Sequence, residues 1–84
     1  MLITLNQDEI SILDRQDPST RTNGGFQSFL VSLQERLDRD TGEISLTDKD
    51  LRRIPQYAFD YAQGGWEDRL NAIFSRSLGP TLGR

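Results

Sequence analysis

Hydrophobic and polar positions alternate in two short segments of this chain and recur at helical spacing in two longer ones. The alternation over Leu2 to Leu5 and over Glu43 to Leu46 predicts two β-strands, because successive side chains of a strand face opposite sides. Apolar residues three and four positions apart predict one helix from Gly24 to about Asp38 and another from Trp66 to about Ser77.

Capping signals predict two further helices. Asn6 stands three residues before Glu9, an arrangement in which each side chain can accept the other residue's backbone N–H at the start of a helix. This helix should end near Arg15 or Gln16, because the following Asp17-Pro18 disfavours helical backbone. Thr47 opens a similar capped helix over Asp48 to Ile54.

Proline and polar residues predict where the remaining chain bends. Pro55 should break or kink the second capped helix, which then continues from Pro55 to Ala62. The polar stretch Ser19 to Asn23 is typical of a loop. The tail, Thr81 to Arg84, is either frayed or docked on the core through Leu82.

These elements predict a single α+β domain over residues 1–84. It is predominantly helical, with four to five short helices and a small two-stranded β-ribbon. A chain of 84 residues can build a core large enough to fold, with little left over for a deep catalytic cleft. The size therefore favours a binding role.

The same order of elements occurs twice. Residues 3–10 resemble residues 44–51 at an offset of 44 − 3 = 41, and the Gly-Gly-aromatic helix start at 24–26 recurs at 64–66, an offset of 64 − 24 = 40. One interpretation is an internal pseudo-repeat with units 1–41 and 42–84. The other is two unrelated stretches that obey common rules of strand and helix formation.

The amino-acid composition excludes several kinds of catalytic site. The chain has no histidine and no cysteine, so Ser-His and Cys-His nucleophiles, thiolate metal sites and disulfides are all excluded. The Gly-Gly pairs fit no phosphate-binding motif, and no spacing of carboxylates implies an acid–base pair. We expect no enzyme activity, catalytic residue, metal or cofactor. Without an apolar span or a signal-peptide pattern, we expect a cytoplasmic protein with no membrane partner.

The net charge is concentrated around the junction of the two units. The segment Asp38 to Asp50 holds five acids and two bases, a balance of 2 − 5 = −3 that equals the charge of the whole chain. Such a patch repels nucleic acid and attracts the basic surfaces of proteins that bind nucleic acid. Alternatively, the acids form an ordinary helix start and a solvated loop. The candidate partner-binding acids are Asp38, Asp40, Glu43, Asp48 and Asp50.

Two tyrosines complete the candidate binding residues. Tyr57 and Tyr61 lie four positions apart on a predicted helix, where tyrosine can serve as a binding hot spot or cover a small core. The other aromatic side chains that fall in apolar stripes are predicted to be core: Phe26, Phe29, Trp66 and Phe74.

Several segments give the chain a resemblance to a known class of small proteins. The run Ile54 to Tyr61 leading into Gly64 to Leu70, with the tail Leu78 to Arg84, resembles small proteins of proteobacterial prophages and mobile elements, among them anti-CRISPR inhibitors. The resemblance implies stoichiometric binding to a CRISPR surveillance complex in the host-cell cytoplasm, which blocks target DNA. It assigns no role to any individual residue.

A second class of function stays open. The chain can instead be a small phage or host structural or assembly protein that acts as a homo-oligomer, with its aromatic face buried against a second copy. A DNA-binding regulator is disfavoured, because the nearest approach to a basic recognition helix is Arg52-Arg53.

Overall fold

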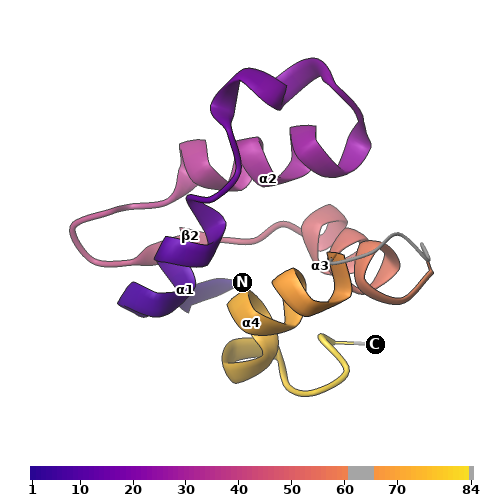
Figure 1. Ribbon diagram of the computed structural model, residues 1–84. Helices are drawn as coiled ribbons and strands as arrows, with labels where there is room; N and C mark the ends of the chain where they lie inside the picture. The colour runs from indigo at the N-terminus through magenta and orange to yellow at the C-terminus, as the bar shows by residue number, and fades with distance from the viewer. Residues whose placement is uncertain (61–65, 84) are drawn as a thin grey trace.

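The computed structural model describes residues 1–60 and 66–83, in which helices dominate around a two-stranded sheet (Figure 1). This confirms the predicted α+β, predominantly helical fold, since 64% of the structure is helical. The elements in order are β1 (Leu2–Thr4), α1 (Gln7–Leu13), the 3₁₀-helix η1 (Pro18–Thr22), α2 (Gly25–Arg36), β2 (Glu43–Ser45), α3 (Asp48–Pro55), the π-helical turn η2 (Gln56–Asp60) and α4 (Trp66–Leu78).

The sheet pairs the two predicted strands antiparallel, with Ile3 opposite Ile44 at its centre. Both isoleucines are buried and face the core, as the alternation requires. Backbone hydrogen bonds extend the pairing at each end, from Leu46 N to Met1 O (2.7 Å) and from Leu5 N to Gly42 O (2.8 Å). These two bonds are equivalent in the two halves of the chain, so the sheet is symmetric about its central pair.

The helices place their apolar stripes around one core. α1 packs along α4, while α2 packs against η1 and touches β2. Leu82 is also buried, so the tail docks on the core rather than fraying. The largest fully buried side chains from the helices are Leu13, Phe26, Phe29, Leu30, Leu33, Ile54, Leu70, Ile73 and Phe74.

The prediction of a loop over Ser19 to Asn23 is wrong, because η1 occupies most of it. Asp17 caps η1 by accepting the Ser19 N–H at 2.9 Å, and Pro18 supplies a backbone angle suited to a first helical turn. The hydrogen bond from the Ser19 backbone holds the pKa of Asp17 below its usual value. α1 ends earlier than predicted, at Leu13 with Asp14 as its C-cap, so the Asp17-Pro18 pair starts η1 and does not itself end α1.

Pro55 changes the helix as predicted, and the change takes a specific form. α3 ends at Pro55 and continues directly into the wider π-helical turn η2. Proline lacks the N–H that an α-helix would use at this position, so the regular hydrogen-bond ladder cannot pass through it. The predicted end of this run, at residues 61–62, lies outside the described residues.

Two arginines link the halves of the chain reciprocally. Arg36 of α2 donates to Asp50 at the start of α3 and to Ser45 O (3.2 Å). Arg76 of α4 donates to Glu9 at the start of α1 and to the carbonyl oxygen of a strand residue, Thr4, at 2.5 Å. Each half thus supplies an arginine to the capping carboxylate and strand of the other half. These equivalent contacts at offsets of 40 and 41 favour a duplicated unit over coincidence.

Candidate protein-binding surface

The turn between α2 and β2 presents the acidic residues on an ordered backbone. Asp38 N donates to Glu43 O (2.9 Å) and Gly42 N donates to Asp38 O (2.7 Å), which closes the turn. The Asp38 carboxylate also accepts the Asp40 N–H at 3.0 Å, and the Thr41 hydroxyl accepts the Glu43 N–H at 3.2 Å. The carboxylates of the turn are therefore held by a hydrogen-bonded loop.

We use the name acidic edge for four of the five predicted acids, which lie along β2 and at its two ends: Asp38, Asp40, Glu43 and Asp48. Glu43 is half-buried and the other three are exposed. Glu43 begins β2, whereas Asp48 lies in the first turn of α3 beyond the other end of the strand. Across residues 1–60 and 66–83, none of the four carboxylates forms an ion pair. The negative charge of the acidic edge is therefore not neutralised by an ion pair within the described residues.

Asp50, the fifth predicted acid, is not part of this surface. It is only 5% exposed, and its two oxygens accept hydrogen bonds from Arg36 at 2.7 and 3.2 Å. Burial alone would raise the pKa of Asp50, but hydrogen bonds from Arg36 and Thr47 and the charge of Arg36 outweigh it and lower the pKa. Asp50 is a structural carboxylate. The Thr47-x-x-Asp50 spacing was the local signal that it turns inward.

Arg39 does not neutralise the acidic edge, although it stands between Asp38 and Asp40. Its guanidinium makes two hydrogen bonds to Asp14, at 2.6 and 3.0 Å, and the Asp14 carboxylate raises the pKa of Arg39. Pairing thus removes one acid, Asp50, and one base, Arg39, from the segment 38–50. The balance becomes 1 − 4 = −3, unchanged from the sequence.

Tyr57 packs partly against the core. Its ring is half-buried, with its centroid 5.6 Å from Phe26 in an edge-on contact and 5.7 Å from Phe29 in a stacked one. Its hydroxyl lies beside Gly25 at the start of α2. Phe26, Phe29 and Phe74 are buried, as predicted. Tyr61 lies outside the described residues, as does the side chain of Trp66.

Tyr57→Ala should therefore lower stability, because it removes a half-buried ring that contacts two phenylalanines. We expect a loss of about 1–2 kcal/mol, below the range for fully buried aromatic residues. Thermal unfolding followed by circular dichroism measures it. Tyr57→Phe is the matched control, because it keeps the ring and its contacts with the two phenylalanines, and it should lose less stability than Tyr57→Ala. Equal stability of Tyr57→Ala and the parent would show instead that the ring contributes little to the core.

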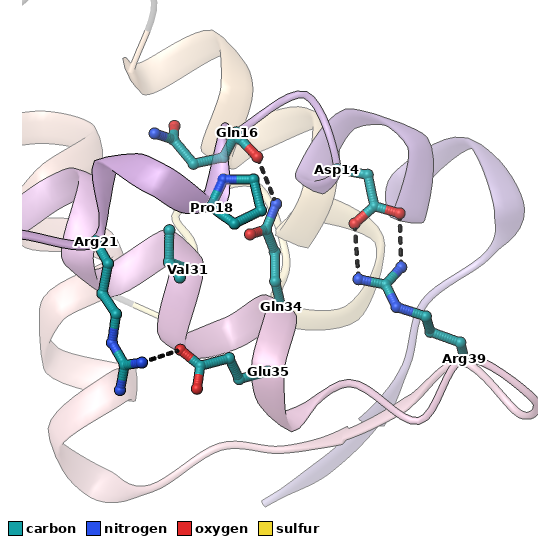
Figure 2. A pocket seen from close by; sticks show the side chains of 8 residues that line it. All are labelled: Asp14, Gln16, Pro18, Arg21, Val31, Gln34, Glu35 and Arg39. Atoms are coloured by element: carbon teal, nitrogen blue, oxygen red, sulfur yellow. Dashed lines mark hydrogen bonds and ion pairs between the residues drawn. The ribbon is translucent and has the colours of Figure 1, made fainter.

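A groove that sequence reasoning missed lies between η1, α2 and the segment that follows α1 (Figure 2). Its volume is 540 Å³. The lining residues are Asp14, Gln16, Pro18, Arg21, Val31, Gln34, Glu35 and Arg39. Arg39 both lines the groove and belongs to the acidic turn, so the two features adjoin. We call this cavity the Gln34 groove.

The position of Gln34 within α2 was the signal that could have revealed the groove. Gln34 is eight residues after Phe26 and four after Leu30, so it falls on the apolar stripe of the helix. A polar side chain at such a position must find hydrogen-bond partners inside the protein. Gln34 finds two, since its Nε2 donates to Leu13 O and to Gln16 O, each at 2.9 Å.

The described residues assemble no metal site. In residues 1–60 and 66–83, no three carboxylates gather into a group that could hold a metal ion, and no helix is both long and apolar enough to cross a bilayer. Comparison with protein-family models, with curated proteins and with solved structures finds no match to this chain.

Proposed function

We propose that this protein is a non-catalytic binding protein whose acidic edge covers a basic, nucleic-acid-binding surface of another protein. The observation that carries the proposal is the charge of segment 38–50. Four carboxylates there lack an ion-pair partner in the described structure, and one lysine, Lys49, accompanies them.

The geometry of the turn suits this role. A flexible acidic loop would lose conformational entropy on binding, whereas the hydrogen bonds around Asp38 and Glu43 already order this one. Complementary charge also speeds the encounter with a basic surface and disfavours neutral or acidic partners. Such a protein need not resemble DNA as a whole, because covering the basic groove is enough to exclude nucleic acid.

The resemblance to anti-CRISPR inhibitors suggests the class of partner. A CRISPR surveillance complex holds nucleic acid in a positively charged channel, and an acidic protein bound there would block target DNA. We therefore propose inhibition by stoichiometric binding to such a complex in the host cytoplasm.

Reversing three charges of the acidic edge tests the proposal. The variant Asp38→Lys, Asp40→Lys, Glu43→Lys should bind a CRISPR surveillance complex at least about tenfold more weakly, mainly through slower association. The salt dependence of binding should also flatten, because fewer charge pairs remain to be screened. Biolayer interferometry at two ionic strengths measures both effects.

The matched control reverses three exposed acids elsewhere, Asp8, Glu67 and Asp68, and so makes the same change in net charge. Circular dichroism confirms that both variants fold. The control should keep most of the affinity. If both variants lost affinity equally, net charge alone would explain the result. If the triple variant of the acidic edge bound the complex as the parent does, the acidic edge would not be part of the interface.

One observation favours the alternative, a homo-oligomeric structural or assembly protein. Leu2 of β1 is 63% exposed, and within the described part of the chain the sheet ends at this strand. A second copy could add its own strand at such an edge and cover the leucine. Sedimentation velocity at several concentrations separates the two functions, because the assembly protein should associate as concentration rises and the inhibitor should stay monomeric.

A further inference from the structure

The Gln34 groove contains a buried hydrogen-bond acceptor without a donor. Gln34 is 8% exposed, and its Oε1 has no hydrogen-bond partner. Both amide hydrogens are used on the carbonyls of Leu13 and Gln16, so the side chain cannot be turned over to satisfy the oxygen. Figure 2 shows the nitrogen directed at Gln16 and the oxygen turned away from it, among the other lining residues.

An unpaired buried acceptor costs about 1–3 kcal/mol of stability. A ligand that brings an N–H group to Gln34 Oε1 would recover this cost as binding free energy. The missing partner is therefore a donor, which excludes carboxylate and phosphate as the group that meets this oxygen.

The surroundings of the acceptor narrow the ligand further. Pro18 and Val31 give the groove apolar surface, and Glu35 contributes a carboxylate. Glu35 is paired with Arg21 at 3.5 Å, the longest of the four ion pairs found in the described residues. The two side chains are 66% and 49% exposed, so the pair contributes at most about 1 kcal/mol. Glu35 can therefore exchange Arg21 for another cation at little cost.

We infer that the Gln34 groove binds an arginine side chain of a partner protein. An arginine offers a methylene stem for Pro18 and Val31, and five N–H donors for Gln34 Oε1 and the Glu35 carboxylate. Because Gln34 Oε1 is itself buried, the incoming guanidinium reaches it only when lining side chains move aside, and the weak Arg21–Glu35 pair makes Arg21 the side chain that moves at least cost. The acidic edge adjoins the groove through Arg39 and attracts basic segments to this face. The inference rests on the proposed function only in taking the partner surface to be basic.

The test uses N-acetyl-arginine methylamide as the probe and the neutral isostere N-acetyl-citrulline methylamide as its control. Nuclear magnetic resonance titration should show saturable shifts of the Gln34 side-chain amide and the Val31 methyl groups with the arginine probe. Citrulline should bind at least about threefold more weakly, because the loss of one charge contact at a half-exposed site is worth up to about 1 kcal/mol. Glu35→Gln should weaken the arginine probe by a similar factor.

Glu43→Gln is the matched variant, since it removes one carboxylate from the acidic edge and leaves the groove lining unchanged. It should bind the probe as the parent does. Equal weakening by Glu35→Gln and Glu43→Gln would overturn the inference, as would equal binding of arginine and citrulline. An internal water that stays at Gln34 Oε1 when the probe is saturating would overturn it as well.

The outcome separates the groove from the proposed function. The triple variant of the acidic edge should still bind the probe at Gln34 even where it fails to bind the surveillance complex. A groove that does not respond, together with charge-dependent binding of the complex, contradicts the groove alone. A responsive groove, together with unaltered binding of the complex by the triple variant, contradicts the proposed function alone.

Discussion

Gly42→Ala is expected to destabilise the domain by about 3 kcal/mol or more, which lowers the melting temperature by about 12 °C or more. Two effects add at this position. Gly42 has φ +80, a conformation that costs a residue with a side chain about 1–2 kcal/mol. In addition, a Cβ at Gly42 would stand 2.4 Å from Leu5 O, a backbone atom whose movement would disturb the end of the sheet.

Gly79→Ala separates the two effects. Gly79 has φ +90, close to that of Gly42, and a Cβ there would meet no atom within 4 Å. It should therefore show only the backbone cost, about 1–2 kcal/mol. Chemical denaturation of both variants gives the two free energies of unfolding. Equal losses would mean that the contact with Leu5 is relieved by a small shift and that the turn is less tightly fixed than its hydrogen bonds indicate.

Arg36→Met should cost about 2–4 kcal/mol, because it leaves the Asp50 carboxylate buried without its cation while the methionine keeps much of the packing. Arg39→Met is the matched control. It removes a pair with Asp14 whose side chains are both substantially exposed, which is worth at most about 1 kcal/mol. Similar losses from the two substitutions would show that burial of Asp50 adds nothing to its pairing with Arg36.

The ion pair between Arg36 and Asp50 should also make the stability of the domain depend on pH. The pKa of Asp50 is lower in the folded protein than the ordinary value of about 3.9 in the unfolded chain. The unfolded state therefore binds this proton more tightly, and the contribution of Asp50 is present above the ordinary pKa and lost as pH falls below it. Asp50→Asn should reduce the loss of stability that the protein shows as pH falls through this range. The stability lost in Arg36→Met should also become smaller there, because a protonated Asp50 no longer needs the cation. If Asp50→Asn lost stability at low pH as the parent does, other carboxylates would be responsible for that loss.

Local patterns predicted most of the secondary structure. The alternation around Ile3 and Ile44 gave the strands to within one residue, and the capping residues Asn6 and Thr47 gave two helix starts. These signals act over a few residues, so a single sequence can reveal them. Asp17-Pro18 was ambiguous because such a pair can follow a helix or start one, and here it starts η1.

The candidate surface depended on contacts between residues far apart in the chain. Arg36 reaches Asp50 across 14 positions and Arg39 reaches Asp14 across 25, and no local spacing predicts either ion pair. The Thr47-x-x-Asp50 spacing indicates only that Asp50 accepts a backbone N–H at the start of its own helix. The sequence therefore shows where the acids are concentrated, but it does not show which bases pair with them in the folded protein. The Gln34 groove forms only when several segments pack around Gln34, so the sequence offers a single signal of it, a polar residue on the apolar stripe of α2.

The reciprocal arginine contacts should make unfolding of the domain cooperative. If α4 detached first, Glu9 would lose the cation of Arg76, and if α2 detached first, Asp50 would lose Arg36. Neither half can loosen without destabilising the other, so partly open forms are less stable than either the folded or the unfolded chain. Unfolding should be all-or-none, and a protease in the cell would seldom meet an intermediate that it could cut.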